Sequence, residues 1–286
     1  MKKLLALMLA LVMVFALAAC GDSGSAATDA PSAEPTDTAE SAAPSEGGDT
    51  AESDLAYVQD KGTLVVGITE FEPMDYQNTD GEWIGFDADL AKEFAESLGV
   101  TVEFQLIDWD NKVMELDGKT IDVVWNGMTL TEDVLAAMEC SQPYLINQQV
   151  VVVPADVAED YQTEESLADL NFAVEIGSAG CEVAQANGYS YTEVADQATA
   201  LLEVASGTAD AAIIDSLMAG AMIGEGTSYA DMTSTVALTS EEYGVGFRKG
   251  SDLAATLNEF LSGKYADGSI QTLAETYGVQ DALVQE

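Results

Sequence analysis

Two short turns in the sequence carry hydroxyls and small residues that suit the binding of a polar ligand. The stretch NGMTLTEDVLAAMECSQPY, residues 126–144, places Thr129 and Thr131 two positions apart and contains no lysine or arginine. The turn GSAG, residues 177–180, consists of small residues that let a ligand approach backbone N–H groups at a helix start. Capping threonines and glycine turns are common, so neither turn establishes a site alone. If both face an anionic ligand, its counter-charge must come from elsewhere in the chain.

Each turn follows a segment that is predicted to be a buried strand. Apolar runs of strand length occur at residues 62–69, 121–127, 148–154, 171–178 and 209–215. Between them, apolar residues recur every fourth position over 86–98 and stop at Gly99, and Thr131 can cap a helix opened by two acids. Further helices are predicted after a cap at Ser251 and over 269–277. The alternation predicts an α/β protein with mostly parallel sheets, whose ligands bind beyond the carboxyl ends of the strands.

The beginning of the chain has the features of an export signal. Two lysines precede an apolar run shorter than the ~20 residues of a membrane-spanning helix, so residues 1–19 are predicted to be a signal peptide. LAAC, residues 17–20, resembles the bacterial lipobox, whose cysteine becomes the lipid-modified first residue; the alternative is an ordinary signal peptide that contains a cysteine. Residues 20–54 are small, polar or acidic and cannot bury enough apolar surface to fold. We expect a disordered tether, anchored by lipid at Cys20 to the outer face of a cell membrane.

The composition limits the partners and cofactors of the protein. A formal net charge of −42 and a single arginine, Arg248, argue against nucleic acid, which requires clustered cations. Cys140 and Cys181 are too distant in sequence to suggest a metal knuckle. A disulfide between them is permitted in an exported protein but is not indicated, and two small buried residues are the alternative. No metal-ligand spacing, calcium loop or dinucleotide turn occurs, so we expect no metal and no cofactor.

Seven segments follow one another in a recognisable order from about residue 61 to 251: GTLVVGITEFEPMDY, DGEWIGFDADLAKEFAESLG, IDVVWNGMTLT, CSQPY, GSAG, ADAAIID and YGVGFRKGSDL. The series resembles the extracellular solute-binding protein of polar amino-acid ABC transporters, family 3 type, over nearly all of the chain after the tether. The resemblance implies a periplasmic-binding-protein-like (type II) fold, in which two crossing strands join two α/β lobes around a ligand cleft. Residues 55–150 with 241–286 would form the first lobe, and 151–240 the second.

The resemblance also implies a function. The protein would capture a small polar solute, an amino acid or a close derivative, and deliver it to ABC permease subunits in the membrane. Closure of the lobes needs only a higher affinity of the solute for the closed form, so no covalent chemistry is required. A monomer is expected.

Individual binding residues follow from the same resemblance. Phe71 takes the place of an aromatic residue that packs on the ligand. Thr129 matches a hydroxyl that helps to hold the ligand carboxylate, together with backbone groups around Asn126 and Gly127. The loop that offers N–H groups to this carboxylate from the second lobe is matched by Ser178, Ala179 and Gly180. Asp215 matches the acid that receives the ligand's ammonium, and a helix cap is the alternative role for it.

The sequence departs from the family pattern at the position of a carboxylate-binding arginine. Val134 stands three residues after the second threonine, where the family usually has that arginine. A charge-assisted hydrogen bond of this kind contributes about 1.5–3 kcal/mol, so another interaction must compensate for its loss. Arg248 aligns with an edge strand that leaves the cleft. Either the ligand lacks a conventional carboxylate, or Lys112 supplies the charge from a neighbouring turn; a solvated helix lysine is the alternative for Lys112.

Two other positions have alternative interpretations. The first glycine turn is one residue shorter than the family pattern, which displaces an acid that often meets the ligand's ammonium. Glu70 or Glu72 would substitute for it, and Glu70 is better placed. Trp125 either lines the pocket or is a buried strand residue.

Two functions of other classes are consistent with the fold. A few exported dehydratases use it, but the chain has no histidine, so acid–base catalysis would depend on carboxylates or lysine. A surface adhesin or a ligand sensor is the other alternative, although sensors of this fold are usually joined to a membrane helix or a signalling domain.

Overall fold

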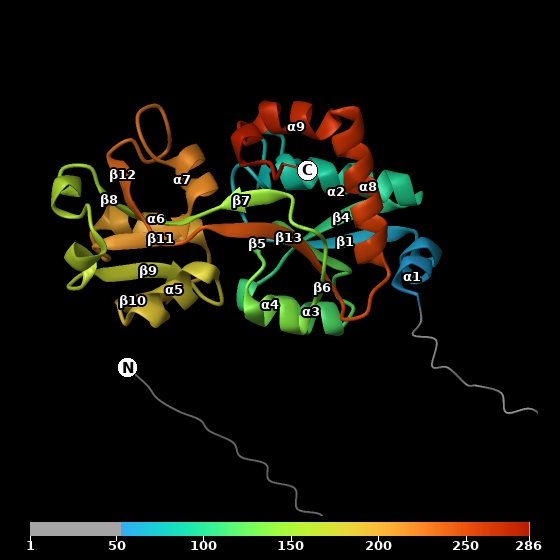
Figure 1. Ribbon diagram of the computed structural model, residues 1–286, viewed down its shortest axis with the longest axis horizontal. Coiled ribbons are helices and arrows are strands. Elements are labelled where there is room, and N and C mark those ends of the chain that lie inside the picture. The colour runs from blue at the N-terminus through green and yellow to red at the C-terminus, as the bar shows by residue number, and fades with distance from the viewer. Residues whose placement is uncertain (1–52, 286) are drawn as a thin grey trace, which may run out of the picture. The chain divides into compact units, whose positions relative to one another are not determined.

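The computed structural model describes residues 53–285, which form two mixed β-sheets with helices packed against them, and one small two-stranded sheet (Figure 1). The α-helices of this part of the chain are α1 (Asp54–Lys61), α2 (Phe86–Leu98), α3 (Lys112–Asp117), α4 (Glu132–Ala137), α5 (Ala179–Asn187), α6 (Gln197–Ser206), α7 (Ser216–Met222), α8 (Leu253–Asp267) and α9 (Ser269–Tyr277). The strands are β1 (Thr63–Ile68), β2 (Tyr76–Gln77), β3 (Trp83–Ile84), β4 (Thr101–Leu106), β5 (Val123–Thr129), β6 (Glu139–Cys140), β7 (Leu145–Asn147), β8 (Gln149–Pro154), β9 (Asn171–Glu175), β10 (Ser190–Val194), β11 (Ala211–Asp215), β12 (Met232–Ala237) and β13 (Glu241–Phe247). Short 3-10 helices are η1 (Trp109–Asn111), η2 (Ala158–Asp160), η3 (Glu164–Leu167) and η4 (Gln280–Ala282). The predicted α/β class is confirmed.

The first sheet has the strand order β4-β1-β5-β13-β6, and β7 pairs with β13. Strands β4, β1 and β5 are parallel, whereas β13 runs antiparallel to β5. Side chains alternate along a strand, so successive residues of β5 enter different cores. Val123 and Trp125 pack in the cluster that contains Phe94 of α2, and Val124 packs with Leu116 of α3. Because both faces are covered, the first half of the strand, Val123–Trp125, is apolar.

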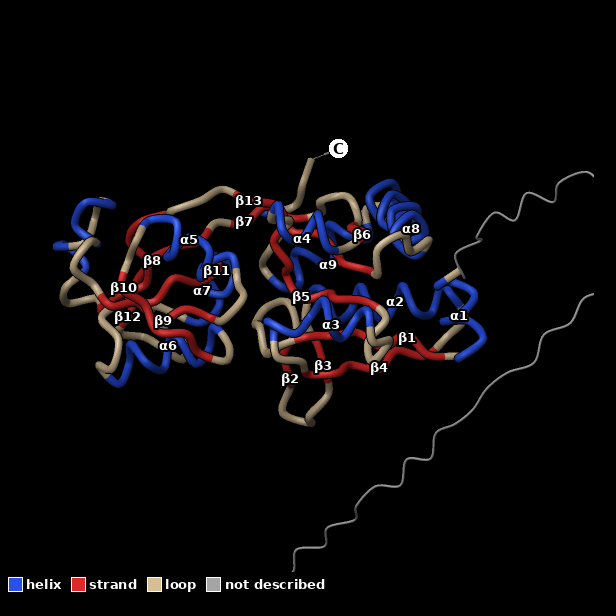
Figure 2. The backbone as a smooth tube through the Cα atoms, turned by 90° about the horizontal axis from the view of Figure 1, so that it is seen from below, coloured by secondary structure: helices blue, strands red, loops and turns tan. Residues whose placement is uncertain are grey.

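The second sheet has the order β10-β9-β11-β8-β12 and is also covered on both faces (Figure 2). Strands β10, β9 and β11 are parallel, and β8 is antiparallel to β11. Along β11, Ala212 and Ile214 pack in the cluster that contains Leu201 of α6. Ile213, which points to the opposite face, packs with Ala184 of α5. The parallel strands β9 and β11 therefore end between these two layers of helix.

Two chain crossings join the sheets. Strand β7 of the first sheet leads into β8 of the second through Gln148, and β12 returns to β13 through residues 238–240 (Figure 1). The crossings are adjacent, since the N–H of Leu238 donates to the carbonyl of Gln149 at 2.8 Å. Each crossing strand runs antiparallel to a neighbour in its sheet. The prediction of mostly parallel sheets was therefore wrong, because a hydrophobic pattern carries no information on strand direction.

Helix boundaries agree closely with the local sequence signals. Helices α2 and α9 have the predicted bounds, and Gly99 ends α2 in the left-handed conformation, with φ 76°. Helix α8 begins one residue later than its predicted cap implies. Its N-cap is Asp252, whose side chain makes no capping bond, while the Ser251 hydroxyl accepts the N–H of Leu253 at 3.3 Å.

The described residues begin before residue 55, at Ser53. Ser53 caps α1, and Asp54, its first residue, forms an ion pair with Arg248 at 3.0 Å between Oδ1 and Nη2. Arg248 is thus held against α1 and the first sheet. The predicted signal peptide and most of the predicted tether lie outside the described residues.

The cysteines that the structure describes are free. Cys181 is buried at the start of α5, and Cys140 is half-buried in β6 of the other sheet, so they form no disulfide. The alternative of two small buried residues holds for Cys181 and only in part for Cys140. Cys20 lies outside the described residues. Within residues 53–285, no helix combines the length and apolar character needed to cross a bilayer.

Candidate functional site

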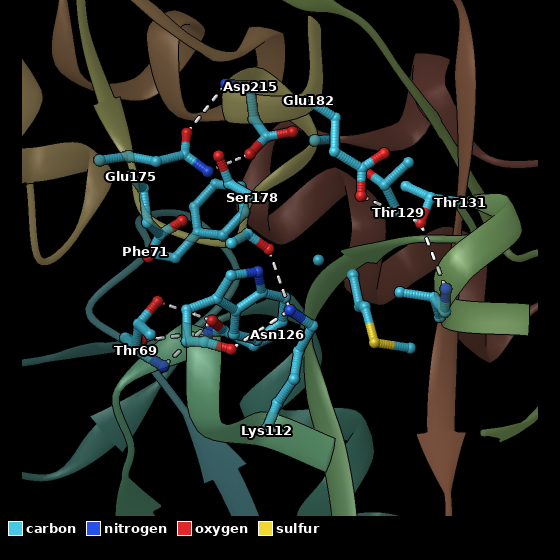
Figure 3. Close-up of a pocket in the computed structure, with 17 residues that line it drawn as sticks. Thr69, Phe71, Lys112, Asn126, Thr129, Thr131, Glu175, Ser178, Glu182 and Asp215 are labelled. Carbon is cyan, nitrogen blue, oxygen red and sulfur yellow. Dashed lines mark hydrogen bonds between the residues drawn. The ribbon is translucent and has the colours of Figure 1, made fainter. Parts of the chain in front are cut away.

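A small cavity lies where the parallel strands of the two sheets end. Residues from the ends of β1, β5, β9 and β11 line it, as expected for ligand sites in α/β sheets (Figure 3). The predicted residues that line it are Phe71, Lys112, Asn126, Gly127, Thr129, Ser178, Ala179 and Asp215. The lining residues that were not predicted as ligand contacts are Thr69, Trp109, Met128, Thr131, Val134, Glu175, Gly177, Glu182 and Gln197.

The lobes are closed around this space. The cavity volume is about 30 Å³, room for only a few water molecules. The Nζ of Lys112, from the first lobe, donates to the carbonyl of Gly177 in the second at 3.0 Å, and the Thr131 hydroxyl donates to Glu182 at 3.4 Å. The cavity adjoins a wider groove of about 650 Å³ along the crossing strands. A larger solute therefore requires the lobes to open or the lining side chains to move.

The Asn126–Gly127 segment is held by a network of buried hydrogen bonds. The Asn126 amide accepts from Thr69 N and Oγ1 at 3.0 and 2.7 Å, and it donates to Asp75 at 2.9 Å. The N–H of Gly127 donates to the Asp87 carboxylate at 2.7 Å. The Gly127 amide is therefore engaged within the protein, and the expectation that it holds a ligand carboxylate does not fit this geometry.

A bulge in β5 turns this segment toward the cavity. The pairing with β13 shifts between Met128 and Val124, next to the site, as bulges often do. Gly127 has φ 55°, and a Cβ there would lie 2.6 Å from the Phe71 ring. Glycine is required on both grounds, because L-residues disfavour this conformation and the ring leaves no space. Phe71, 2% exposed, forms an aromatic wall of the cavity.

The tryptophans divide between core and cavity. Trp125 is fully buried and packs edge-on against Phe94, which supports its interpretation as a strand residue of the core. Trp109, in η1, lines the cavity instead. No sequence signal separated Trp109 from a surface residue, because it lies in a short irregular segment.

Lys112 is buried in the cavity wall. Its side chain lies over the Trp109 ring, with Nζ 4.8 Å from the ring centroid, and donates to the carbonyls of Trp109 and Gly177 at 3.2 and 3.0 Å. Burial lowers the pKa of Lys112, and the charge of Glu175 opposes this shift. Among the described lining residues Lys112 is the only lysine or arginine, and Val134 also lines the cavity. The alternative of a solvated helix lysine does not hold.

The GSAG turn opens α5 toward the cavity. The Ser178 hydroxyl caps the helix by accepting the N–H of Cys181 at 3.1 Å. The amides of Ala179 and Gly180 are the first two of the helix and have no acceptor among residues 53–285. Ala179 lines the cavity, whereas Gly180 packs on β11, where a Cβ would lie 2.9 Å from the Ile213 carbonyl.

Asp215 lies at the end of β11 and is surrounded by side-chain amides. Its carboxylate accepts from Gln149 at 2.7 Å and also from Asn147 and Gln197. Burial and then the charge of Glu241 raise the pKa of Asp215 to about 7. Asp215 stands at the N-cap position of α7 but makes no capping bond, so its side chain serves the cavity and not the helix.

Glu241 connects the site to the crossing strands. Its Oε1 accepts from Asn147 at 2.7 Å, from Gln149 at 2.8 Å and from the Thr129 hydroxyl at 2.9 Å. The Thr129 proton is thus directed to Glu241 in this closed form. The cluster joins both crossings to the residues around Asp215.

Glu175 is a buried acid that sequence reasoning missed. It ends β9, is 3% exposed, and its Oε1 has no hydrogen-bond partner. Burial, followed by the charges of Asp215 and Asp196, raises the pKa of Glu175 to about 8. The available signal was an acid that closes an apolar strand just before a glycine turn.

Glu70 and Glu72 are exposed and do not line the cavity. The expectation that Glu70 substitutes for the displaced acid is therefore not supported by the geometry.

Two α/β lobes, two crossing strands and a closed polar cavity define a class of proteins that enclose small solutes. A family model of bacterial extracellular solute-binding proteins, family 3, matches residues 64–280, and the chain belongs to this family. The L-cystine-binding protein TcyJ of Escherichia coli (strain K12) is 29% identical over 227 residues, 78% of this chain and 85% of that protein. The arginine-binding extracellular protein ArtP of Bacillus subtilis (strain 168) is 28% identical over 287 residues, 97% of this chain and 98% of that protein.

A solved structure is also similar. The ABC uptake transporter substrate binding protein from Streptococcus pneumoniae, with bound histidine, has a TM-score of 0.75 and 28% identity, covering 82% of this chain and 100% of that one.

Proposed function

We propose that this protein is the substrate-binding component of an ABC importer and captures an amino acid or a close derivative. The observation that carries the proposal is the closed cavity between two lobes, which places Phe71, Lys112 and Asp215 around one small space. The relatives bind cystine and arginine by name, and the similar solved structure holds histidine. The role is binding and delivery to permease subunits, without catalysis.

The cavity suits the two charged groups of an amino acid. Asp215 would receive the α-ammonium, because its carboxylate lies at the end of β11 in the cavity wall. Lys112 would meet the α-carboxylate in place of the family's arginine. An ammonium has three N–H donors, and Lys112 gives two to carbonyls, which leaves one for a solute. The free amide of Ala179 would add a second donor.

Closure would couple binding to transport. We propose that residues 55–150 with 241–286 form one lobe and residues 151–240 the other, hinged at the two crossings. The contacts Lys112–Gly177 and Thr131–Glu182 join the lobes in the closed form. A solute that adds contacts only in this form shifts the population toward it, and a permease can then distinguish loaded from empty protein. We propose a monomer, tethered through a lipid on Cys20 and facing outside the cell.

A thermal-shift screen over the standard amino acids and the amines derived from them tests this function. A solute at about 100 times its dissociation constant adds about 2.7 kcal/mol to the stability of the folded form. We expect at least one amino acid to raise the melting temperature and to be recovered chemically unchanged by mass spectrometry. A flat response to every amino acid and to the amines derived from them would refute the proposal, and recovery of a converted product would point to the dehydratase alternative.

A further inference from the structure

Glu175 has a position that structural stability does not explain. Its carboxylate is 3% exposed, lines the cavity, and leaves Oε1 without a hydrogen-bond partner. A buried charged group without a partner destabilises the folded protein, so such groups are usually paired or hydrogen-bonded. Asp215, in contrast, accepts hydrogen bonds from three side-chain amides. Oε1 of Glu175 is therefore available to a molecule that enters the cavity.

The charges of Lys112 and Glu175 attract each other, but the two side chains form no direct ion pair within the described residues. The Lys112 ammonium instead donates to two backbone carbonyls. The cavity lining thus holds two buried acids, Glu175 and Asp215, and a third acid at its edge, Glu182, against one buried cation. A neutral amino acid brings one positive and one negative group, which leaves this imbalance unchanged. A solute with one further positive group reduces it.

We propose that Glu175 binds a second cationic group of the solute, in addition to the ammonium that Asp215 receives. This inference rests on the proposed function and narrows it to solutes with two protonated nitrogen centres. A cationic amino acid satisfies Glu175, Asp215 and Lys112 together. A diamine satisfies the two acids and leaves Lys112 without a carboxylate.

The raised pKa of Glu175 allows a second chemistry that the test must separate. Burial favours the protonated acid, and a protonated Glu175 would donate a hydrogen bond to a neutral solute. Glutamine in place of Glu175 retains a donor of similar shape and removes only the capacity to carry negative charge. The variant Glu175→Gln therefore distinguishes ion pairing from neutral hydrogen bonding.

The experiment measures dissociation constants by calorimetry for the wild type and for Glu175→Gln. The solutes are L-arginine, L-lysine, agmatine and putrescine, with L-citrulline as the uncharged counterpart of arginine. Glu159→Gln is the matched control, because it removes the same charge from an exposed residue of the second lobe. Melting curves of the unliganded variants check folding.

We expect the wild type to bind a dicationic solute at least tenfold more tightly than L-citrulline. Glu175→Gln should weaken the binding of that solute by about 10- to 100-fold, the range of a charge-assisted hydrogen bond. The dissociation constant for L-citrulline should change by no more than a factor of about three. Glu159→Gln should behave as wild type. Preference for arginine over agmatine identifies an amino acid as the solute, and the reverse preference identifies an amine.

The inference fails if Glu175→Gln binds the dicationic solute as tightly as wild type, or if none of the four dicationic solutes binds. If the wild type binds only neutral amino acids, the inference is wrong and the proposed transport function stands. If no amino acid and no amine binds, the proposed function itself is wrong.

Discussion

At the scale of single residues, the positive charge of the cavity lies on α3 and not on α4, where the resemblance to the family placed an arginine. Val134, on α4, contributes only an apolar contact to the wall. Lys112, at the start of α3, brings an ammonium to the same space and is held there by two carbonyls and the Trp109 ring. A lysine ammonium is a compact point charge, so it can meet a carboxylate but not with the paired geometry of a guanidinium.

The variant Lys112→Met tests this role. Methionine keeps the apolar stem over Trp109 and removes the charge, so the affinity for a carboxylate-bearing solute should fall roughly 10- to 100-fold, as expected for one charge-assisted hydrogen bond. Isothermal titration with the solute found in the screen measures the change. Lys264→Met, on the outer helix α8, is the control and should bind as wild type. An unchanged affinity in Lys112→Met would show that the charge of Lys112 does not contribute to solute binding.

At the scale of elements, the turns after the strands bring the lobes into contact. Gly177, between β9 and α5, has φ 68°, and a Cβ there would lie 2.9 Å from Oδ1 of Asp110 in the other lobe. Gly188, at the far end of α5, has φ 69° and open space around it. The two glycines thus share a backbone conformation, and only the first lies at the contact between lobes.

Alanine substitutions at these two positions distinguish the effect of backbone strain on stability from the effect of overpacking on lobe closure. Both Gly177→Ala and Gly188→Ala should lower the stability by about 1 kcal/mol, because L-residues disfavour the left-handed region. Only Gly177→Ala should also weaken solute binding, by roughly 5- to 100-fold. The added methyl group would overpack the contact between the lobes and destabilise the closed form by about 1–3 kcal/mol. Thermal denaturation and titration measure the two effects. Equal affinities of the two variants would show that closure does not depend on this approach.

At the scale of the whole molecule, the acid-rich interior makes stability depend on pH. Burial, as the leading cause, raises the pKa of Asp87 to about 6, of Asp215 to about 7 and of Glu175 to about 8. These groups have ordinary values near 4 in the unfolded chain. Between pH ~4 and ~8 the folded state therefore holds more protons than the unfolded state, and the free energy of unfolding falls as pH rises.

The melting temperature of the unliganded protein should accordingly fall between pH 5 and pH 8. We expect a decrease on the order of 5 °C, measured by calorimetry in buffers of matched ionic strength. Repulsion among surface acids acts in the same direction but is screened by salt, whereas buried acids are screened much less. The decrease should therefore persist in ~0.5 M salt, about five times the ~0.1 M of the usual reference condition. A melting temperature that rises between pH 5 and pH 8 would contradict the raised pKa values of the buried acids.

Much of the fold could be predicted from local patterns. The period of apolar residues and the stop at Gly99 gave α2 its bounds, and the unbroken apolar runs gave β5, β8, β9 and β11. Strand direction could not be predicted, because β8 and β13 are reversed by the two crossings and not by any feature of their own residues. The site was predicted in part, through residues that match the family in the turns after the strands.

The sequence by itself determined which segments are buried strands, where their turns place hydroxyls and small residues, and that the carboxylate-binding arginine is absent. Only the tertiary structure decided which of these groups are free to bind. The Gly127 amide is engaged by Asp87, 40 residues away, whereas Glu175 is left without a partner at Oε1. Burial and helix capping can be predicted from short-range sequence patterns. Whether a buried polar group has a hydrogen-bond partner depends on residues that only the folded chain brings together.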